Sequence, residues 1–280
     1  MSYPTLLLPL DDDPHAGARL ALTTRLAQAW RSHVIGLSCH RPASVPAGDL
    51  PGLRPTDPLT LDLLRAQRCA EERERAFRLR CEAADLASFE LRADGDEPGQ
   101  AVARHARGSD LVILGQPDRS DPEFAARRTV LDYVLRHTPR PLLVVPWAGR
   151  FEAPGGTVLL AWDDSREAAR AAADGLPLMR RARAVHVVQF ETGTARRERV
   201  DAARLEPVVR WLAGHDIEAS AVVLHAGGDV GNALLSHAAD VDADLLVMGA
   251  WGTSRWAERV IGGATRTVLE SMTMPVLMAH

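Results

Sequence analysis

The sequence contains no lysine, because all 33 of its basic residues are arginine. This absence excludes a Walker-A lysine, a Schiff-base lysine and a Ser-x-x-Lys nucleophile, since each of those mechanisms needs an amine. Arginine still binds phosphate through its planar guanidinium group. Any recognition of phosphate by this chain must therefore use arginine, hydroxyl groups or backbone amides.

Cysteine is also scarce. The chain has three cysteines, Cys39, Cys69 and Cys81, with no C-x-x-C spacing and none in the second half. An odd, unclustered set favours free thiols over a disulfide framework or a zinc site. The sequence carries no metal motif.

The chain lacks a long apolar run and a strong excess of either charge. Its net charge is -4, and its charged residues, 25% of the total, have both signs interspersed. This pattern indicates neither a nucleic-acid-binding surface nor a polybasic membrane patch. Carboxylates at Asp11 and Asp12 interrupt the N-terminal apolar segment before it reaches signal or membrane length. We expect a cytoplasmic protein that binds neither nucleic acid nor membranes.

One segment of the sequence occurs twice. The segment SDLVILG at 109–115 returns as ADLLVMG at 243–249, and PLLV at 141–144 returns as PVLM at 275–278. A repeat of this length has the size of a compact domain. We predict domains at 1–148 and 157–280, joined by a linker at 149–156 where glycine and proline break the apolar pattern.

Short apolar segments alternate with longer segments of helical period, which predicts parallel sheets covered by helices. The fold class is therefore α/β, with two tandem doubly wound domains, each a five-stranded parallel sheet with helices on both faces. The expected strands are 5–10, 33–38, 87–91, 111–114 and 142–145, followed by 158–162, 184–190, 218–224, 245–248 and 276–278. Residues 41–58 read as a surface loop, and Ser165 as a helix N-cap.

The second half carries a glycine pattern at a place where ligands collect. Gly249 and Gly252 follow the strand expected at 245–248, and Gly262 and Gly263 come after nine intervening residues, at the start of a helix. Ligands of open parallel sheets bind beyond the carboxyl ends of the strands, where helix N-termini present free amides. Turn formation alone would also explain the glycines. The candidate site residues are Asp163, Gly249, Gly252, Gly262, Gly263 and Thr265.

With these residues the chain resembles the universal stress protein family in its tandem form, over essentially its full length. The resemblance implies an adenine nucleotide alpha-hydrolase-like fold, and its ATP-binding members carry Gly-x2-Gly-x9-Gly-(Ser/Thr) with an Asp after the first strand. Gly249, Gly252 and Gly262 match the glycines, and Asp163 matches the acidic position. Gly263 replaces the phosphate-binding hydroxyl. Thr265 matches a second hydroxyl position.

The first half departs further from this pattern. It keeps Asp11 and Gly115, but Gln116-Pro117-Asp118 follows the glycine, and Arg128 and Thr129 replace Gly262 and Gly263. Proline offers no amide donor, and an aspartate repels phosphate. We expect that the first half does not bind nucleotides.

The resemblance implies a non-enzymatic cytoplasmic stress-response protein that binds ATP or another adenine nucleotide in its second domain. Loss of one hydrogen bond at Gly263 weakens binding by about 1.5–3 kcal/mol, so weak binding is expected. We also expect the two halves to pair through their last strands, and the tandem chain to form a homodimer. The sequence does not identify a protein partner.

Two alternatives remain open. One is a structural or adaptor protein that binds no nucleotide, which the missing hydroxyl at Gly263 supports. The other is a nucleotide-hydrolysing enzyme on the same fold. Such relatives carry His-x-Gly-His or Ser-Gly-Gly-x-Asp-Ser near the first strand; residues 15–18, His-Ala-Gly-Ala, fail the first pattern and no segment supplies the second.

Overall fold

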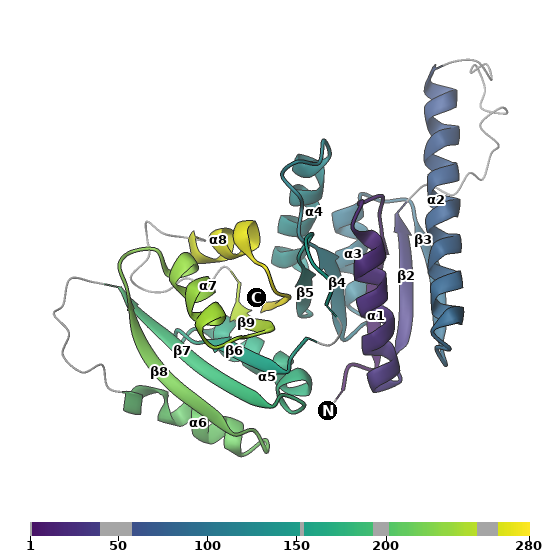
Figure 1. Cartoon of the computed structure of the whole chain (residues 1–280). Coiled ribbons are helices and arrows are strands. Elements are labelled where there is room, and N and C mark those ends of the chain that lie inside the picture. The colour runs from purple at the N-terminus through teal and green to yellow at the C-terminus, as the bar shows by residue number, and fades with distance from the viewer. Residues whose placement is uncertain (1, 40–57, 152–153, 193–201, 251–262) are drawn as a thin grey trace. The chain divides into compact units, whose positions relative to one another are not determined.

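The computed structural model describes residues 2–39, 58–151, 154–192, 202–250 and 263–280 (Figure 1). The first half contains β1 (Thr5–Leu10), α1 (Ala16–Trp30), β2 (His33–Cys39), α2 (Pro58–Ala83), β3 (Phe89–Asp94), α3 (Pro98–Ala106), β4 (Leu111–Gly115), α4 (Phe124–His137) and β5 (Leu142–Val145). The second half contains β6 (Thr157–Ala161), α5 (Arg166–Met179), β7 (Ala184–Thr192), the 3-10 helix η2 (Ala202–Leu205), α6 (Glu206–Ala213), β8 (Ala219–Ala226), α7 (Val230–Asp240), β9 (Leu245–Gly249), α8 (Gly263–Ser271) and β10 (Val276–Ala279).

The predicted α/β fold is confirmed, and a strand is present at each of the ten expected places. The largest difference is β3, which was expected at 87–91 and lies at 89–94. Its end is polar, and pairing with β2, from Phe89 opposite Val34 to Asp94 opposite Cys39, determines its extent in place of an apolar pattern. The loop predicted at 41–58 lies outside the described residues except for Pro58, where α2 begins.

Contacts divide the chain into two compact units. The N-terminal unit comprises residues 3–115 and 119–138, and the C-terminal unit comprises 1–2, 116–118 and 139–280. These divisions differ from the boundary predicted at 148, because β5 and the segment 116–118 group with the second half. The N-terminal unit contains strands in the order β3-β2-β1-β4, and the C-terminal unit contains β5-β10-β9-β6-β7-β8.

The last strands of the two halves pair with each other, as predicted. Within the C-terminal unit, β10 runs antiparallel to β5, with Leu277 opposite Leu143, and parallel to β9, with Leu277 opposite Val247. The other pairs in each unit are parallel. The antiparallel pair thus joins the last strand of one repeat to the last strand of the other.

The strand register aligns the two halves residue by residue. Leu6 of β1 pairs with Leu111 of β4, and Val158 of β6 pairs with Leu245 of β9. The second pair repeats the first at the same positions of the two strands, so the halves share one topology. The same alignment matches Asp11 with Asp163, Asp13 with Ser165, Arg19 with Ala171 and Gly115 with Gly249.

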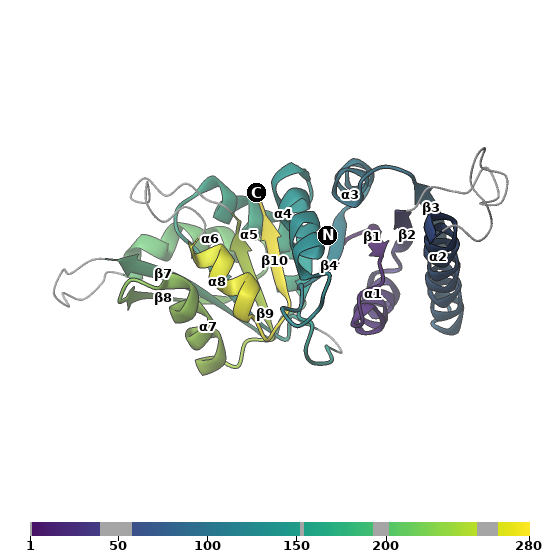
Figure 2. The ribbon, with the colours of Figure 1, turned by 90° about the horizontal axis from the view of Figure 1, so that it is seen from above.

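Within each unit, helices cover both faces of the strands (Figure 2). In the N-terminal unit α1 and α2 lie on one face and α3 and α4 on the other; in the C-terminal unit α5 and α6 lie opposite α7 and α8. Right-handed crossovers between parallel strands produce this arrangement. The central strands are therefore buried on both sides: residues 6–8 of β1 and 158–160 of β6 are at most 2% exposed. This explains their continuous apolar sequences.

Candidate functional site

The candidate site of the second half lies at the carboxyl ends of β6 and β9. These strands are adjacent and parallel, so their carboxyl ends meet at one edge of the sheet. Asp163 follows β6, and Gly249 is the last residue of β9. The structure thus places two of the predicted site residues at the edge where ligands of parallel sheets bind.

Asp163 is exposed and only partly engaged in hydrogen bonds. Its Oδ1 accepts hydrogen bonds from the backbone nitrogen of Ser165 at 3.1 Å and from Ser165 Oγ at 2.5 Å. No described residue donates a hydrogen bond to its Oδ2. Asp163 is therefore a carboxylate anchored through Oδ1, whose Oδ2 has no donor among the described residues.

Ser165 is the N-cap of α5, as the sequence predicted. Its Oγ accepts a hydrogen bond from the backbone nitrogen of Ala168 at 3.0 Å, which satisfies one of the free amides of the first turn. Glu167 in the same turn is 7% exposed and is favoured there by the helix dipole. A carboxylate beside the helix N-terminus also reduces its attraction for phosphate.

Gly249 permits a close contact between β9 and the start of α5. A Cβ at this position would lie 2.6 Å from the backbone nitrogen of Ala168 and 2.7 Å from the backbone carbon of Glu167. Real Cβ atoms do not approach backbone so closely. The sequence interpretation assigned this glycine to ligand approach, whereas the structure shows that helix packing already requires it.

The other predicted residues lie along α8 or outside the described residues. Gly263 is the first described residue of α8. Thr265 follows in the same helix and is 5% exposed, so its hydroxyl is not on the surface. Gly252 and Gly262 fall in residues 251–262, outside the described part of the chain.

Sequence reasoning missed a second aspartate that shapes the β6–α5 loop. Asp164 has a positive φ of 59°, a left-handed conformation that aspartate tolerates better than most residues. Its Oδ1 accepts a hydrogen bond from Trp162 Nε1 at 2.8 Å, and its Oδ2 accepts one from Gln189 Nε2 at 3.2 Å. The loop is thereby tied to β7, which fixes the position of the neighbouring Asp163.

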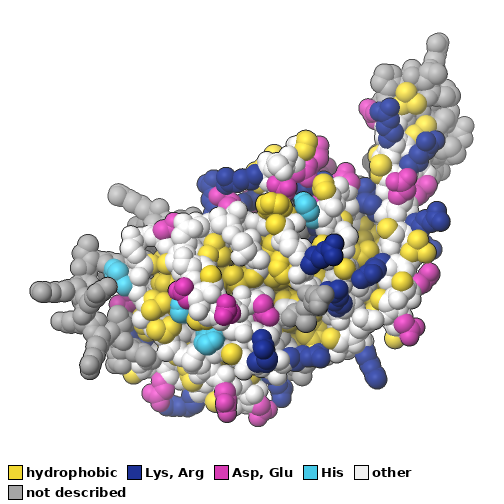
Figure 3. Space-filling view, viewed as in Figure 1, with side chains coloured by type: hydrophobic (Ala, Val, Ile, Leu, Met, Phe, Trp, Pro, Cys, Tyr) yellow, Lys and Arg dark blue, Asp and Glu magenta, His cyan; other side chains and the backbone are white. Residues whose placement is uncertain are grey.

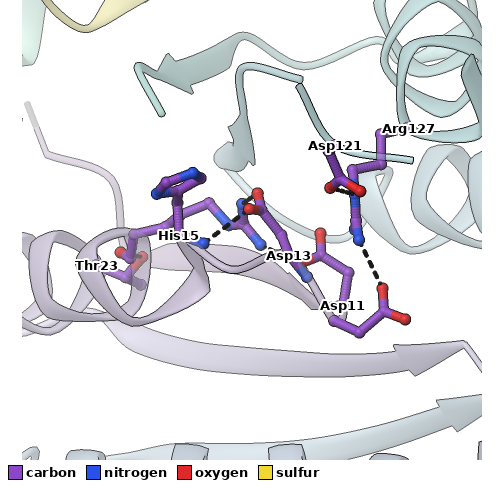
Figure 4. Close-up of polar contacts among 8 residues, drawn as sticks. Asp11, Asp13, His15, Thr23, Asp121 and Arg127 are labelled. Atoms are coloured by element: carbon purple, nitrogen blue, oxygen red, sulfur yellow. Dashed lines mark hydrogen bonds and ion pairs between the residues drawn. The ribbon is translucent and has the colours of Figure 1, made fainter. Parts of the chain in front are cut away.

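In the first half, an arginine binds the aspartates at the corresponding strand end; two of these, Asp11 and Asp13, are labelled in Figure 4. Arg19 of α1 is 3% exposed; its Nη2 donates to Asp11 Oδ1 at 2.5 Å, and its Nη1 donates to Asp13 Oδ2 at 2.8 Å. Burial lowers the pKa of this guanidinium, but attraction to Asp11 and Asp13 outweighs burial and raises the pKa overall. Arg19 therefore stays charged and bound.

The sequence contained a signal for Arg19. Arg19, Leu22 and Leu26 have the spacing of one helix face, and all three are buried. A charged residue on such a face requires a buried partner of opposite charge. The three consecutive aspartates at 11–13 supply that partner.

A second arginine engages the middle aspartate of the same loop. Arg127 of α4 donates to Asp12 Oδ1 at 3.0 Å through Nη2 and to Asp121 Oδ2 at 2.8 Å through Nε (Figure 4). Burial lowers the pKa of Arg127, and these two hydrogen bonds raise it above its ordinary value. All three aspartates at 11–13 thus have partners within the chain.

Gln116 gives the loop after β4 a structural role. This side chain is 2% exposed, and its Nε2 donates to the carbonyl oxygen of Leu269 in α8 at 2.9 Å. Its Oε1 accepts from the backbone nitrogen of Trp147 at 3.3 Å. Gln116, the first residue after β4, therefore anchors α8 within the C-terminal unit.

The described residues offer little to redox or metal chemistry. All three cysteines are free, as predicted, and burial raises the pKa of both Cys39 and Cys81 to about 11, which disfavours the reactive thiolate. Among these residues, no group of three or more His, Cys, Asp or Glu side chains is arranged to hold a metal ion.

Within the described residues, too, no helix has the length and apolarity to cross a membrane. Arg, Asp and Glu side chains are interspersed over the described part of the face in Figure 3.

Comparison with known proteins gives a consistent result. The model of the universal stress protein family matches residues 2–146 and 156–280. The chain is similar in structure to a universal stress protein from Archaeoglobus fulgidus DSM 4304, with 17% identity, a TM-score of 0.72 and coverage of 98% of this chain and 95% of that one. It is also similar to a functionally unknown protein from Pseudomonas aeruginosa PAO1, with 17% identity, a TM-score of 0.58 and coverage of 99% and 92%. At these identities the likeness concerns the fold. No curated protein matches the sequence.

Proposed function

Because the chain belongs to the universal stress protein family, we propose that it is a non-enzymatic stress-response protein of the cytoplasm that binds ATP or another adenine nucleotide weakly in its second half. One observation carries this proposal. Asp163 follows the carboxyl end of β6, is exposed and is anchored by Ser165, and no residue in the described part of the chain donates to its Oδ2. A ribose hydroxyl or a base amino group is a donor suited to that oxygen.

The start of α8 supports phosphate binding in the second half and also limits the affinity of that binding. Gly263 begins this helix, and a helix N-terminus attracts anions through its free amides. Gly263 supplies no hydroxyl, so one hydrogen bond to a charged oxygen is missing. That bond is worth about 1.5–3 kcal/mol, which corresponds to roughly ten- to a hundredfold in affinity. We therefore expect a dissociation constant on the order of a millimolar.

Titration calorimetry with ATP on the full chain tests the proposal. We expect saturable binding that Asp163→Asn abolishes, because the substitution removes the charge and keeps the size of the side chain. Asp240→Asn is the matched control, since Asp240 is an exposed aspartate of the same half on α7 and should leave binding unchanged. The absence of saturable heat at several millimolar ATP would contradict nucleotide binding. Sustained phosphate or AMP release proportional to protein concentration would contradict the non-enzymatic assignment.

A structural or adaptor protein without nucleotide binding is the second candidate. Gly263 and the internal ion pairs of Asp11 favour it, because both remove groups that a nucleotide would use. In either case we propose that the tandem chain associates with a second copy, as a homodimer. Light scattering should then report twice the chain's 30.4 kDa.

A further inference from the structure

Arg19 lies where an external ligand would have to bind the N-terminal unit. Its guanidinium reaches from α1 to the carboxyl end of β1, where it binds Asp11 and Asp13. Of the two carboxylates, Asp13 has only 7% of its side chain exposed and Asp11 has 37%. The most buried part of this contact is therefore already filled by a cation from the same chain.

Gly115 shows that the end of β4 accommodates this guanidinium. A Cβ at Gly115 would lie 2.2 Å from Arg19 Nη1 and 2.8 Å from Asp13 Oδ2. The absence of a side chain at this position leaves the room that the guanidinium occupies. The strand end, the two carboxylates and Arg19 thus form one fitted arrangement.

The C-terminal unit keeps the strand-end glycine and one carboxylate of that arrangement but lacks the arginine and the second carboxylate. Its equivalents are Ala171 for Arg19 and Ser165 for Asp13, and Ala171 is fully buried without any polar group. Gly249, the equivalent of Gly115, lies against the first turn of α5, where its nearest neighbours are the backbone of Ala168 and Glu167, and no guanidinium occupies this place. Asp163 is consequently left exposed, with its Oδ2 receiving no hydrogen bond from a described residue.

We propose that Arg19 is a built-in ligand of the N-terminal unit, which closes that unit to external ligands and leaves one ligand site per chain. A guanidinium suits the place because it is a planar cation whose paired N–H groups match carboxylate oxygens and stay charged at every physiological pH. The statement that the other half is open rests on the proposed function. The occupancy of the N-terminal unit by Arg19 does not depend on it.

Chemical rescue of an Arg19→Ala variant tests the occupancy. The substitution leaves Asp11 and Asp13 around an empty space, and we expect the melting temperature to fall on the order of 10 °C. Guanidinium chloride at low millimolar concentration should then raise the melting temperature of this variant, because a ligand bound by the native state stabilises it. Arg19→Met, which fills the space without charge, is the matched control and should show no rise. Sodium chloride at equal concentration controls for ionic strength.

An equal response of Arg19→Ala and Arg19→Met to guanidinium, or no response of either, overturns the proposal. Should Arg19→Ala fail to fold, NMR of the wild-type arginine side chains replaces it, with Arg19→Met assigning the signals. Bound Nη protons of Arg19 should be separately resolved and slow to exchange; averaged, fast-exchanging signals overturn the proposal.

Equilibrium dialysis with ATP distinguishes the two proposals. One ATP per wild-type chain agrees with both, and two per chain overturns the closed N-terminal unit. No bound ATP, together with successful guanidinium rescue, refutes the proposed nucleotide function and supports the occupancy by Arg19.

Discussion

In the first half, Asp11 is held by a buried arginine, whereas in the second half its counterpart Asp163 is exposed and, among the described residues, is held by Ser165 alone. The strands that carry these two aspartates have the same neighbours and the same register. Backbone pairing and apolar burial therefore preserve the fold, while a few side chains at the strand ends decide what each half can bind. Function has to be argued from those side chains and not from the fold.

The largest expected difference between the halves concerns Arg19. Arg19→Ala should lower the free energy of unfolding by about 3–5 kcal/mol, because it leaves a buried carboxylate without its partner. Urea denaturation followed by circular dichroism measures this. Arg166→Ala, which removes an arginine whose side chain is 93% exposed in the other half, should change stability by less than about 0.5 kcal/mol. Equal losses in the two variants would show that Arg19 is an ordinary surface arginine.

The second prediction concerns a substitution that should raise the affinity of the second half for ATP. Gly263→Ser adds the hydroxyl that the nucleotide pattern has at the start of α8, and it should tighten ATP binding by roughly ten- to a hundredfold, or about 1.5–3 kcal/mol. Calorimetry against the wild type measures the change. Thr129→Ser, at the equivalent position of the first half, should leave affinity unaltered. An unchanged dissociation constant for Gly263→Ser would mean that phosphate does not reach α8.

A third comparison uses the two equivalent glycines. Gly249→Ala should destabilise the chain by about 1–3 kcal/mol, because the new Cβ meets the backbone of α5, which cannot move alone. Gly115→Ala brings its Cβ against the end of the Arg19 side chain, which can shift, so its cost should be smaller. Chemical denaturation of both variants checks the order. The reverse order would indicate that Arg19 is the more rigid neighbour.

The smallest predicted effect is a difference between the halves in how their stability depends on pH. Burial lowers the pKa of His237 in α7, with His186 adding to the shift and Asp240 opposing it. The folded state then binds fewer protons than the unfolded state, so stability is present above the ordinary value of 6.5 and falls as the pH drops below it. The pKa of Asp94 in β3 is lowered to about 2, mainly by a hydrogen bond from Arg104, so its contribution persists until the pH falls below 3.8.

Urea midpoints measured between neutral pH and pH 4 should therefore decrease first for the C-terminal unit. His237→Gln should remove that decrease, while Asp94→Asn should leave it in place. A wild-type midpoint that is constant over this range would refute the role of His237.

The sequence predicted the strands well because each central strand is buried on both faces and has a continuous apolar sequence. The three buried leucines of β1 are an example. Polar strand ends such as that of β3 were missed, because pairing with β2 determines them. Asp164 was also missed as a bridge, since its partner Gln189 is distant in sequence and only the fold brings them together. Arg19 could have been predicted, because its spacing from Leu22 and Leu26 places it on the buried face of α1. The glycine pattern gave no sign of it, since that pattern compares the residues that follow β4 and β9.

The pairing of β5 with β10 has a consequence for how the chain assembles. β10 is paired on both of its edges, by β9 and by β5, and all three strands belong to one chain. If the two halves were separate chains, the pairing of β5 with β10 would depend on their concentrations. Here the pairing is intramolecular, so dilution cannot dissociate it. The thermal transition of this pairing should accordingly be independent of protein concentration, and a second chain must attach through some other surface.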